Sequence, residues 1–120
     1  MDAEGPARLP QRYCVLRDYT MVYPDALAVT AGESVLVGKE DTQWPYVWCT
    51  NSAGKGGWIP QTYIQRDGAR GRVLRDFDSC ELTVSVGEIV LATMEEGGWL
   101  WCRNDQGQSG WVPEENLQAL

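Results

Sequence analysis

Short runs of β-branched and aromatic residues alternate with polar turns along the whole chain, a pattern that predicts β-strands. Residues 34–37 and 88–92 are rich in Val, Leu and Ile, and residues 46–50 and 99–103 are rich in aromatics. Each aromatic run is followed by a turn containing Asn and Gly, and then by a Gly-Trp-(Ile/Val)-Pro block. This order predicts a β-hairpin. No stretch shows a sustained helical period.

The ends of the two hairpins predict how each half of the chain closes. Pro60 and Pro113 lack the backbone N–H that strand pairing needs, so pairing should end there. Residues 61–63 and 114–116 fit a single short turn before a last strand. Each half then holds about five short strands in about 55 residues, which predicts an all-β chain of small, strongly bent barrels.

The same sequence blocks occur twice in the same order, which predicts two homologous domains. The repeated blocks are 15–19 with 73–77, 32–33 with 87–88, 48–49 with 101–102, and 57–60 with 110–113. Their offset falls from 58 to 53 residues, and loops absorb such insertions at low cost. We therefore predict domains at 12–65 and 72–120, joined by a short Gly-rich linker at 66–71. Residues 1–11 are predicted to be a flexible N-terminal segment.

Charge and length of apolar runs limit the class of partner. The net charge is −7, with five acidic and four basic residues in 12–65, and nine acidic and four basic residues in 70–120. This balance argues against nucleic acid, which needs basic surfaces. It suits a basic partner, or serves only solubility. No run approaches the roughly 18 apolar residues of a membrane span, so we expect no membrane insertion.

The residues that usually carry chemistry are sparse. The chain has four cysteines without a Cys-x-x-Cys pair and has no histidine, so we expect no metal site. No nucleophile–base pair and no glycine-rich phosphate loop is present, so we expect no enzyme and no cofactor. Cys49 and Cys102 occupy equivalent positions and should be buried, reduced thiols. Residues 1–12 lack a secretory apolar region, and with reduced thiols this predicts a cytoplasmic protein.

The repeated blocks resemble the Src homology 3 (SH3) domain family. The family's opening Ala-Leu-Tyr-Asp-Tyr is similar to 15–19 and 73–77, and its Gly-x-x-Pro-x-x-Tyr-(Val/Ile) matches Gly57 to Ile64 in full. The second copy departs from this pattern at Asn116, which stands in place of the Tyr. The resemblance covers 12–65 and 72–118, and it implies two five-stranded SH3-type barrels in tandem.

The resemblance also implies a non-catalytic adaptor or scaffold module that binds proline-rich or basic peptide segments. Family members hold a polyproline helix on a groove of parallel aromatic rings, and acidic loop residues receive an adjacent Arg or Lys. Carried over residue by residue, the first groove contains Tyr19, Asp25, Trp44 or Tyr46, Pro60 and Tyr63. The second contains Phe77, Asp78, Glu81, Glu95, Glu96, Trp99, Pro113 and Asn116.

Departures from the family pattern leave two functions open. Arg17 and Arg75 stand where the family has its first groove ring, and each either repels a cationic ligand or stacks on an aromatic. The alternative to peptide binding is a scaffolding tandem with degenerate grooves. Its paired domains would form a composite surface for protein binding or oligomerisation, and the short linker allows such domain–domain contact. Trp48 and Trp101 would belong to that interface, unless each simply packs on its neighbouring strand.

Overall fold

The computed structural model describes residues 9–120, and within this range it contains strands and two 3-10 turns but no α-helix. The strands are β1 Gln11–Val15, β2 Ala28–Val29, β3 Ser34–Glu40, β4 Tyr46–Thr50, β5 Gly56–Pro60, β6 Ile64–Asp67, β7 Arg70–Val73, β8 Phe77–Asp78, β9 Ile89–Glu96, β10 Trp99–Arg103, β11 Ser109–Pro113 and β12 Leu117–Ala119. The 3-10 turns are η1 Gln61–Tyr63 and η2 Glu114–Asn116. The predicted all-β fold is confirmed, and both short turns follow the prolines expected to end pairing.

The strands follow from the alternation of apolar and polar side chains. In β3, Val35 and Val37 are buried while Ser34 and Leu36 face outward, because successive side chains of a strand point to opposite faces. The equivalent Gly-Glu pairs before β3 and β9 form matching turns. Gly32 and Gly87 both have a φ of 93°, a left-handed backbone conformation that glycine adopts without steric cost.

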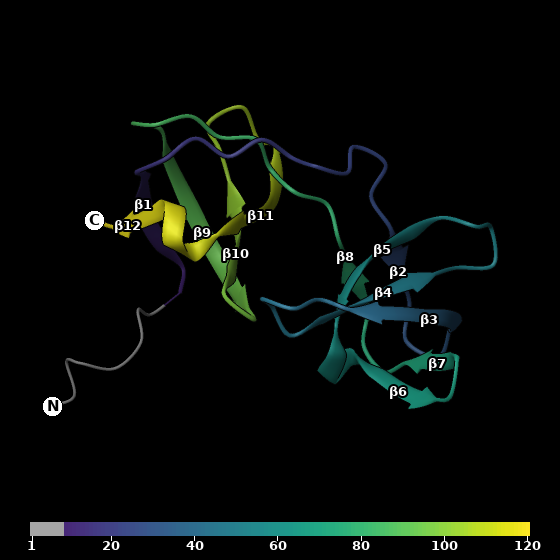
Figure 1. The fold of residues 1–120 in the computed structure, drawn as a ribbon. Coiled ribbons are helices and arrows are strands. Elements are labelled where there is room, and N and C mark those ends of the chain that lie inside the picture. The colour runs from purple at the N-terminus through teal and green to yellow at the C-terminus, as the bar shows by residue number, and fades with distance from the viewer. Residues whose placement is uncertain (1–8) are drawn as a thin grey trace, which may run out of the picture. The chain divides into compact units, whose positions relative to one another are not determined.

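The two opening strands of the repeats are exchanged between the two five-stranded sheets. One sheet has the order β5-β4-β3-β7-β6, and the other has the order β11-β10-β9-β1-β12. Strand β7 belongs to the second repeat by sequence, yet it lies between β3 and β6 of the first (Figure 1). Strand β1 correspondingly lies between β9 and β12. Each sheet therefore contains four strands of one repeat and the opening strand of the other.

A two-residue turn explains this exchange. The segment 66–71, predicted as a linker, is a β-hairpin in which β6 pairs with β7 and Asp67 lies opposite Arg70. Gly68 has a φ of 63° at the first central position of the turn, as tight hairpin turns require. Because only Gly68 and Ala69 join the strands, β7 has to run back along β6. It thereby occupies the place that β1 would take in an unexchanged first domain.

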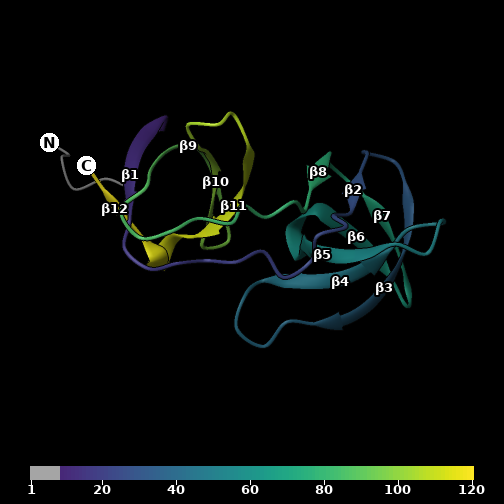
Figure 2. The same ribbon diagram turned by 90° about the horizontal axis from the view of Figure 1, so that it is seen from above.

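The compact units of the structure consequently differ from the domain boundaries predicted from the repeat. One unit, here called the continuous unit, is Val22–Glu81, and Figure 2 shows its strands from above. The other, here called the split unit, joins the described residues 9–21 with Leu82–Leu120. The predicted flexible segment 1–11 lies mostly outside the described residues, and Gln11 already belongs to β1.

Each unit has a core that depends on a strand from the other repeat. In the split unit, Tyr13 and Val15 of β1 pack into a cluster of buried residues from the second repeat. The other buried members of this cluster are Leu82, Val84, Val90, Ala92, Leu100, Cys102, Val112 and Leu117. In the continuous unit, Val73 of β7 is 1% exposed and Phe77 of β8 is 7% exposed. Neither repeat alone contains the complete core of either unit as the structure builds it.

Candidate functional site

The split unit presents an aromatic pair formed by Tyr19 and Trp99. The ring centroids lie 5.6 Å apart with an interplanar angle of 83°, an edge-to-face arrangement that aromatic pairs prefer. Both residues are half-buried. Trp99 begins β10, where it lies opposite Pro113 of β11. We call Tyr19, Trp99 and Pro113 the split-unit cluster.

Backbone hydrogen bonds and one asparagine fix the segment that carries Tyr19. The Tyr19 N–H donates to the Val84 carbonyl at 2.9 Å, and the Val84 N–H donates back at 2.8 Å. The Asn116 side-chain amide donates to the carbonyls of Arg17 and Asp18, both at 3.2 Å. Asn116 is buried, so these bonds satisfy its amide inside the protein. Its predicted contact with a peptide stays a prediction, whereas its bonds to the Tyr19 segment are a finding.

The continuous unit has a more enclosed aromatic cluster. The rings of Tyr63 and Phe77 lie 5.4 Å apart, edge to face, and the two residues are 5% and 7% exposed. The guanidinium of Arg75 lies over the Tyr63 ring, 4.7 Å from its centroid, in a cation–π contact. We call Tyr63, Phe77 and Arg75 the continuous-unit cluster.

The two arginines that replace the family's first ring behave differently. Arg75 stacks on an aromatic ring, which is one of the two alternatives that the sequence left open. Arg17 instead donates from its guanidinium to the Glu115 carbonyl at 2.8 Å. The ring that Arg75 covers is Tyr63, and the second repeat has Asn116 at the corresponding place. The difference between the arginines therefore follows from the exchange of Tyr63 in the first repeat for Asn116 in the second.

The strand exchange changes which predicted site residues come together. Tyr19 was expected beside Pro60 and Tyr63 of its own repeat, and Phe77 was expected beside Trp99. In the structure Tyr19 pairs with Trp99, and Phe77 pairs with Tyr63. Each cluster thus takes one aromatic residue from each repeat.

Strand register decides between the two candidates for the groove tryptophan of the first repeat. Tyr46 lies opposite Pro60, as Trp99 lies opposite Pro113, so Tyr46 is the structural counterpart of Trp99. Trp44 lies in the preceding loop, where its backbone N–H donates to the Asp41 carboxylate at 2.9 Å. Tyr46 is buried and Trp44 is half-buried.

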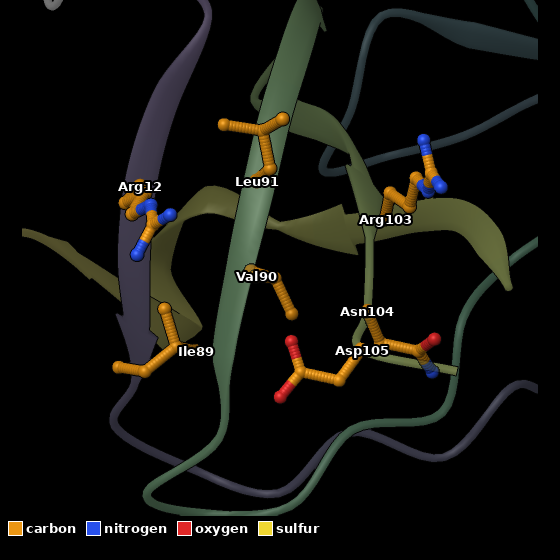
Figure 3. Close-up of a pocket in the computed structure, with 7 residues that line it drawn as sticks. All are labelled: Arg12, Ile89, Val90, Leu91, Arg103, Asn104 and Asp105. Carbon is orange, nitrogen blue, oxygen red and sulfur yellow. The ribbon is translucent and has the colours of Figure 1, made fainter. Parts of the chain in front are cut away.

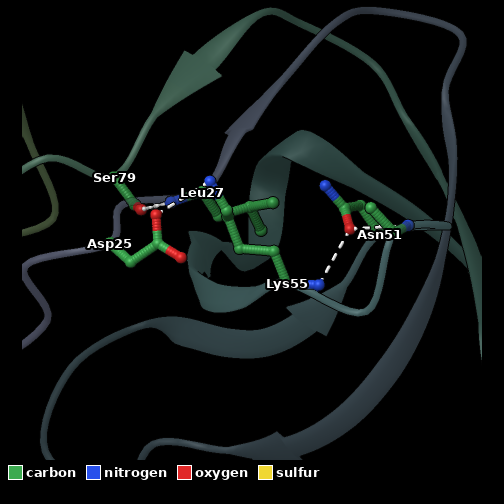
Figure 4. A network of polar contacts seen from close by, with 6 residues as sticks. Asp25, Leu27, Asn51, Lys55 and Ser79 are labelled. Carbon is green, nitrogen blue, oxygen red and sulfur yellow. Dashed lines mark hydrogen bonds and ion pairs between the residues drawn. The ribbon is translucent and has the colours of Figure 1, made fainter.

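The predicted acidic residues are divided between the two units. Three of them lie in the continuous unit, where their carboxylates bond to groups in its loops. Asp25 forms an ion pair with Lys55 at 2.9 Å, although Asp25 is largely exposed (Figure 4). Asp78 accepts the Cys80 N–H at 2.9 Å, and Glu81 accepts the Val22 N–H at 2.9 Å. Asp78 and Glu81 therefore belong to the continuous unit, not to the unit of Trp99 as the repeat suggested.

The other two acidic residues lie on the split unit. Glu96 is the register partner of Trp99, and Glu95 is the partner of Leu100 at the end of β9. Burial raises the pKa of the Tyr13 hydroxyl, and the charges of Glu114 and Glu95 add to this shift. The split unit therefore keeps negative charge next to its aromatic pair.

Trp48 and Trp101 each pack against a tryptophan on the neighbouring strand. The ring centroids of Trp48 and Trp58 are 5.2 Å apart, and those of Trp101 and Trp111 are 5.3 Å apart. In each pair the two ring planes are nearly perpendicular. The Trp48 ring also covers Gly56 so closely that a Cβ there would lie 2.5 Å from it. Strand packing thus accounts for both residues. A role in an interface stays a prediction.

The two equivalent cysteines are buried, as predicted. Cys49 and Cys102 are both 0% exposed, and both are free thiols. Burial raises the pKa of the Cys49 thiol to about 11 and that of Cys102 to about 12. Among residues 9–120 no group of three or more metal-ligating side chains comes together, and no helix there is long and apolar enough to cross a membrane.

Comparison with known proteins identifies the family of both repeats. The sequence is 27% identical over 138 aligned residues to the SH2/SH3 adapter protein dreadlocks of Drosophila melanogaster. The alignment covers 96% of this chain but 25% of that protein, so the chain spans about a quarter of the relative's length. The family described as variant SH3 domain matches residues 12–67 and again residues 70–120. The chain therefore belongs to the SH3 domain family, as a tandem of two variant SH3 domains whose opening strands are exchanged.

Proposed function

We propose that this protein–protein interaction module binds a basic, proline-containing segment of a partner at the split-unit cluster. The observation that carries the proposal is the edge-to-face pair of Tyr19 and Trp99, half-buried beside Pro113. Flat rings of this kind pack against the prolines of a polyproline helix, which loses little entropy on binding because it is already extended. SH3 domains are one of the families that use aromatic surfaces in this way.

The charge next to the ring pair supports a basic ligand. Glu95 and Glu96 end β9 in register with the start of β10, where Trp99 lies. Carboxylates at the edge of an aromatic surface favour an Arg or Lys that follows the prolines. Exposed charge pairs are screened over about 10 Å at 0.1 M salt, so the affinity should fall as salt rises.

The continuous-unit cluster supports a smaller contribution to binding. Arg75 covers one face of the Tyr63 ring, and Phe77 contacts its edge. Phe77 also lacks the hydroxyl that Tyr19 has at the equivalent position. A ligand would have to displace Arg75 to reach Tyr63, so we expect the split unit to provide most of the affinity.

The test is the affinity of the whole chain for a synthetic peptide with two prolines separated by two residues and an adjacent arginine. Trp99→Ala should weaken binding by about 2 kcal/mol, or roughly 30-fold, as loss of a central aromatic anchor does. Trp44→Ala is the matched control, because Trp44 is a half-buried tryptophan of the continuous unit. It should leave the affinity nearly unchanged. Isothermal titration calorimetry at two salt concentrations measures both the affinity and its salt dependence.

A conservative pair of variants separates the two units further. Tyr19→Phe should weaken binding, whereas Tyr63→Phe, which removes the equivalent kind of hydroxyl in the other unit, should not. Thermal unfolding of each variant checks that the fold is intact. If Trp99→Ala and Tyr19→Ala both bind the peptide as the unaltered chain does, the proposal is wrong, and a scaffolding tandem becomes the better explanation.

The setting we propose is the cytoplasm, where thiols stay reduced. Its support is that Cys14, Cys49, Cys80 and Cys102 are all free thiols in the structure. Titration of the thiols in freshly prepared, denatured protein should give four reduced groups. A disulfide in that preparation would contradict the proposed compartment.

A further inference from the structure

The outer face of the split unit's sheet carries a row of side chains with a different character from the split-unit cluster. Arg12 of β1 lies opposite Leu91 of β9, and Leu91 lies opposite Arg103 of β10. Ile89 comes two residues before Leu91 and so points to the same side of the sheet. We call Arg12, Ile89, Leu91 and Arg103 the arginine-flanked face.

This face borders an open cavity of about 390 Å³ (Figure 3). Ile89 and Leu91 are 38% and 37% exposed, so two neighbouring aliphatic side chains on one sheet face are accessible to a partner. Figure 3 shows the two arginines on either side of Leu91 and Asp105 at the other end of the cavity, near Val90. The lining therefore combines an apolar floor with two cations and one anion.

The charge of the arginine-flanked face is opposite to that of the chain. The chain carries a net charge of −7, yet two arginines stand here around exposed aliphatic side chains. Among the described residues, Arg12 and Arg103 form no side-chain ion pair, whereas Lys55 and Arg66 do. These two guanidinium groups therefore remain available to an external carboxylate.

The continuous unit provides an internal comparison, because the same row exists there in a reduced form. Arg70 of β7 lies opposite Leu36, and Leu36 lies opposite Thr50. Arg70 and Leu36 correspond to Arg12 and Leu91, but Thr50 stands in place of Arg103. Ser34 likewise stands in place of Ile89. Only the split unit has both arginines and both aliphatic residues.

We propose that the arginine-flanked face docks an acidic segment of a partner protein, with an apolar side chain on Leu91 and Ile89 between two carboxylates. Neighbouring strands lie about 4.8 Å apart, so the backbones of Arg12 and Arg103, two strands apart, are separated by roughly 10 Å. In an extended segment, side chains four residues apart point to the same side and are separated by about 13 Å, a span that two long arginine side chains can bridge, and the residue midway between them also points to that side. Guanidinium groups bind carboxylates through paired hydrogen bonds, which favours this geometry.

This site is separate from the proposed peptide-binding cluster and selects the opposite charge. A basic, proline-containing segment would be repelled by Arg12 and Arg103, and an acidic segment would be repelled by Glu95 and Glu96. The split unit would then hold two different partner segments, which suits an adaptor.

The test uses the full chain and a synthetic peptide with two glutamates four residues apart and a leucine midway between them. The double variant Arg12→Gln with Arg103→Gln should weaken binding roughly tenfold, because each exposed charge pair contributes only modestly. Arg70→Gln is the matched control at the equivalent position of the continuous unit, and it should bind as the unaltered chain does. Both arginines are on the surface, so the melting temperature should stay the same.

Three outcomes would overturn the proposal. The first is equal binding of the acidic peptide to the double variant. The second is equal binding of a peptide in which both glutamates are glutamine, because the charges would then have no role. The third is stronger, arginine-dependent binding of a single-stranded oligonucleotide, which would make the ligand a nucleic acid. In the supporting outcome, binding falls with salt, and Thr50→Arg together with Ser34→Ile gives the continuous unit a second site.

Discussion

Replacing Gln118 with cysteine tests the exchanged position of β1 directly. In the β1–β12 pairing Cys14 lies opposite Gln118, and Cys14 is already a free thiol. Side chains directly opposite each other have Cβ atoms about 4.5–5.5 Å apart, and a disulfide needs about 3.5–4.5 Å, so a small adjustment brings the two sulfurs together. Mild oxidation of the Gln118→Cys variant should therefore form an intramolecular disulfide.

The expected stabilisation follows from the length of chain that the disulfide encloses. It would close a loop of about 100 residues, for which the chain-entropy treatment gives about 4.7 kcal/mol at 25 °C. Engineered disulfides usually reach less than this value, because bonding distorts the native geometry. We expect the oxidised variant to gain about 2–4 kcal/mol in its free energy of unfolding, measured by urea denaturation with and without a reductant.

The matched control is Gln65→Cys. Gln65 lies opposite Arg72 in the β6–β7 pairing, and this pair occupies the place that Gln118 and Cys14 occupy in the split unit. In an unexchanged chain Cys14 would lie beside Gln65 instead. Peptide mapping that finds the disulfide in Gln65→Cys and not in Gln118→Cys would refute the exchange. A disulfide-linked dimer of Gln118→Cys would instead show that β1 is exchanged between two copies of the chain.

Other predictions concern stability. Asn116→Ala should lower the free energy of unfolding by about 2 kcal/mol in urea denaturation, because it leaves two backbone carbonyls without donors. An unchanged free energy of unfolding would show that these two hydrogen bonds do not stabilise the fold. Cys49→Ser or Cys102→Ser should cost about 1–3 kcal/mol by the same measurement, since each buries an extra polar group. Both thiols should react slowly with iodoacetamide in the native state, and fast labelling at neutral pH would contradict their burial. Because burial raises their pKa values from 9.0 to about 11 and about 12, the stability they contribute is fully present below pH 9 and falls as pH rises towards those values. Gly71→Ala should lower the melting temperature, because its Cβ would lie 2.5 Å from the Ile64 side chain.

Local patterns in the sequence predict most of the strands, because each depends on residues close together in the chain. The hairpin of β10 and β11 was expected from its aromatic run, its turn and its closing proline, and it forms with Trp99 opposite Pro113. The pairing of the opening strands was not predictable in the same way. The blocks at 15–19 and 73–77 are nearly the same, so they do not indicate which sheet each opening strand joins.

One overlooked signal would have pointed to the exchange. Gly68-Ala69 lies between two short runs that both contain β-strand residues, and a glycine at the first of two loop residues is a hairpin signal. Interpreted as a linker, the segment suggests two independent domains; interpreted as a turn, it places β7 beside β6. The hydrogen bonds of Asn116 could not be predicted from local sequence patterns, because its partners Arg17 and Asp18 are almost a hundred residues away in the chain.

The exchanged strands also set an order in which the chain folds. During synthesis the continuous unit has all its strands once Glu81 has emerged, whereas β1 must wait for β9 and finally β12. Joining β1 to β12 directly would close a loop of about 100 residues, which makes folding slow. Once the continuous unit has folded, the Val22 N–H lies 2.9 Å from the Glu81 carboxylate, so the two ends of the inserted unit are already together. The folded continuous unit then acts as a short connection between β1 and the segment that begins at Leu82. The loop that must close when β1 joins β9 and β12 is therefore effectively shorter, and its entropic cost is lower.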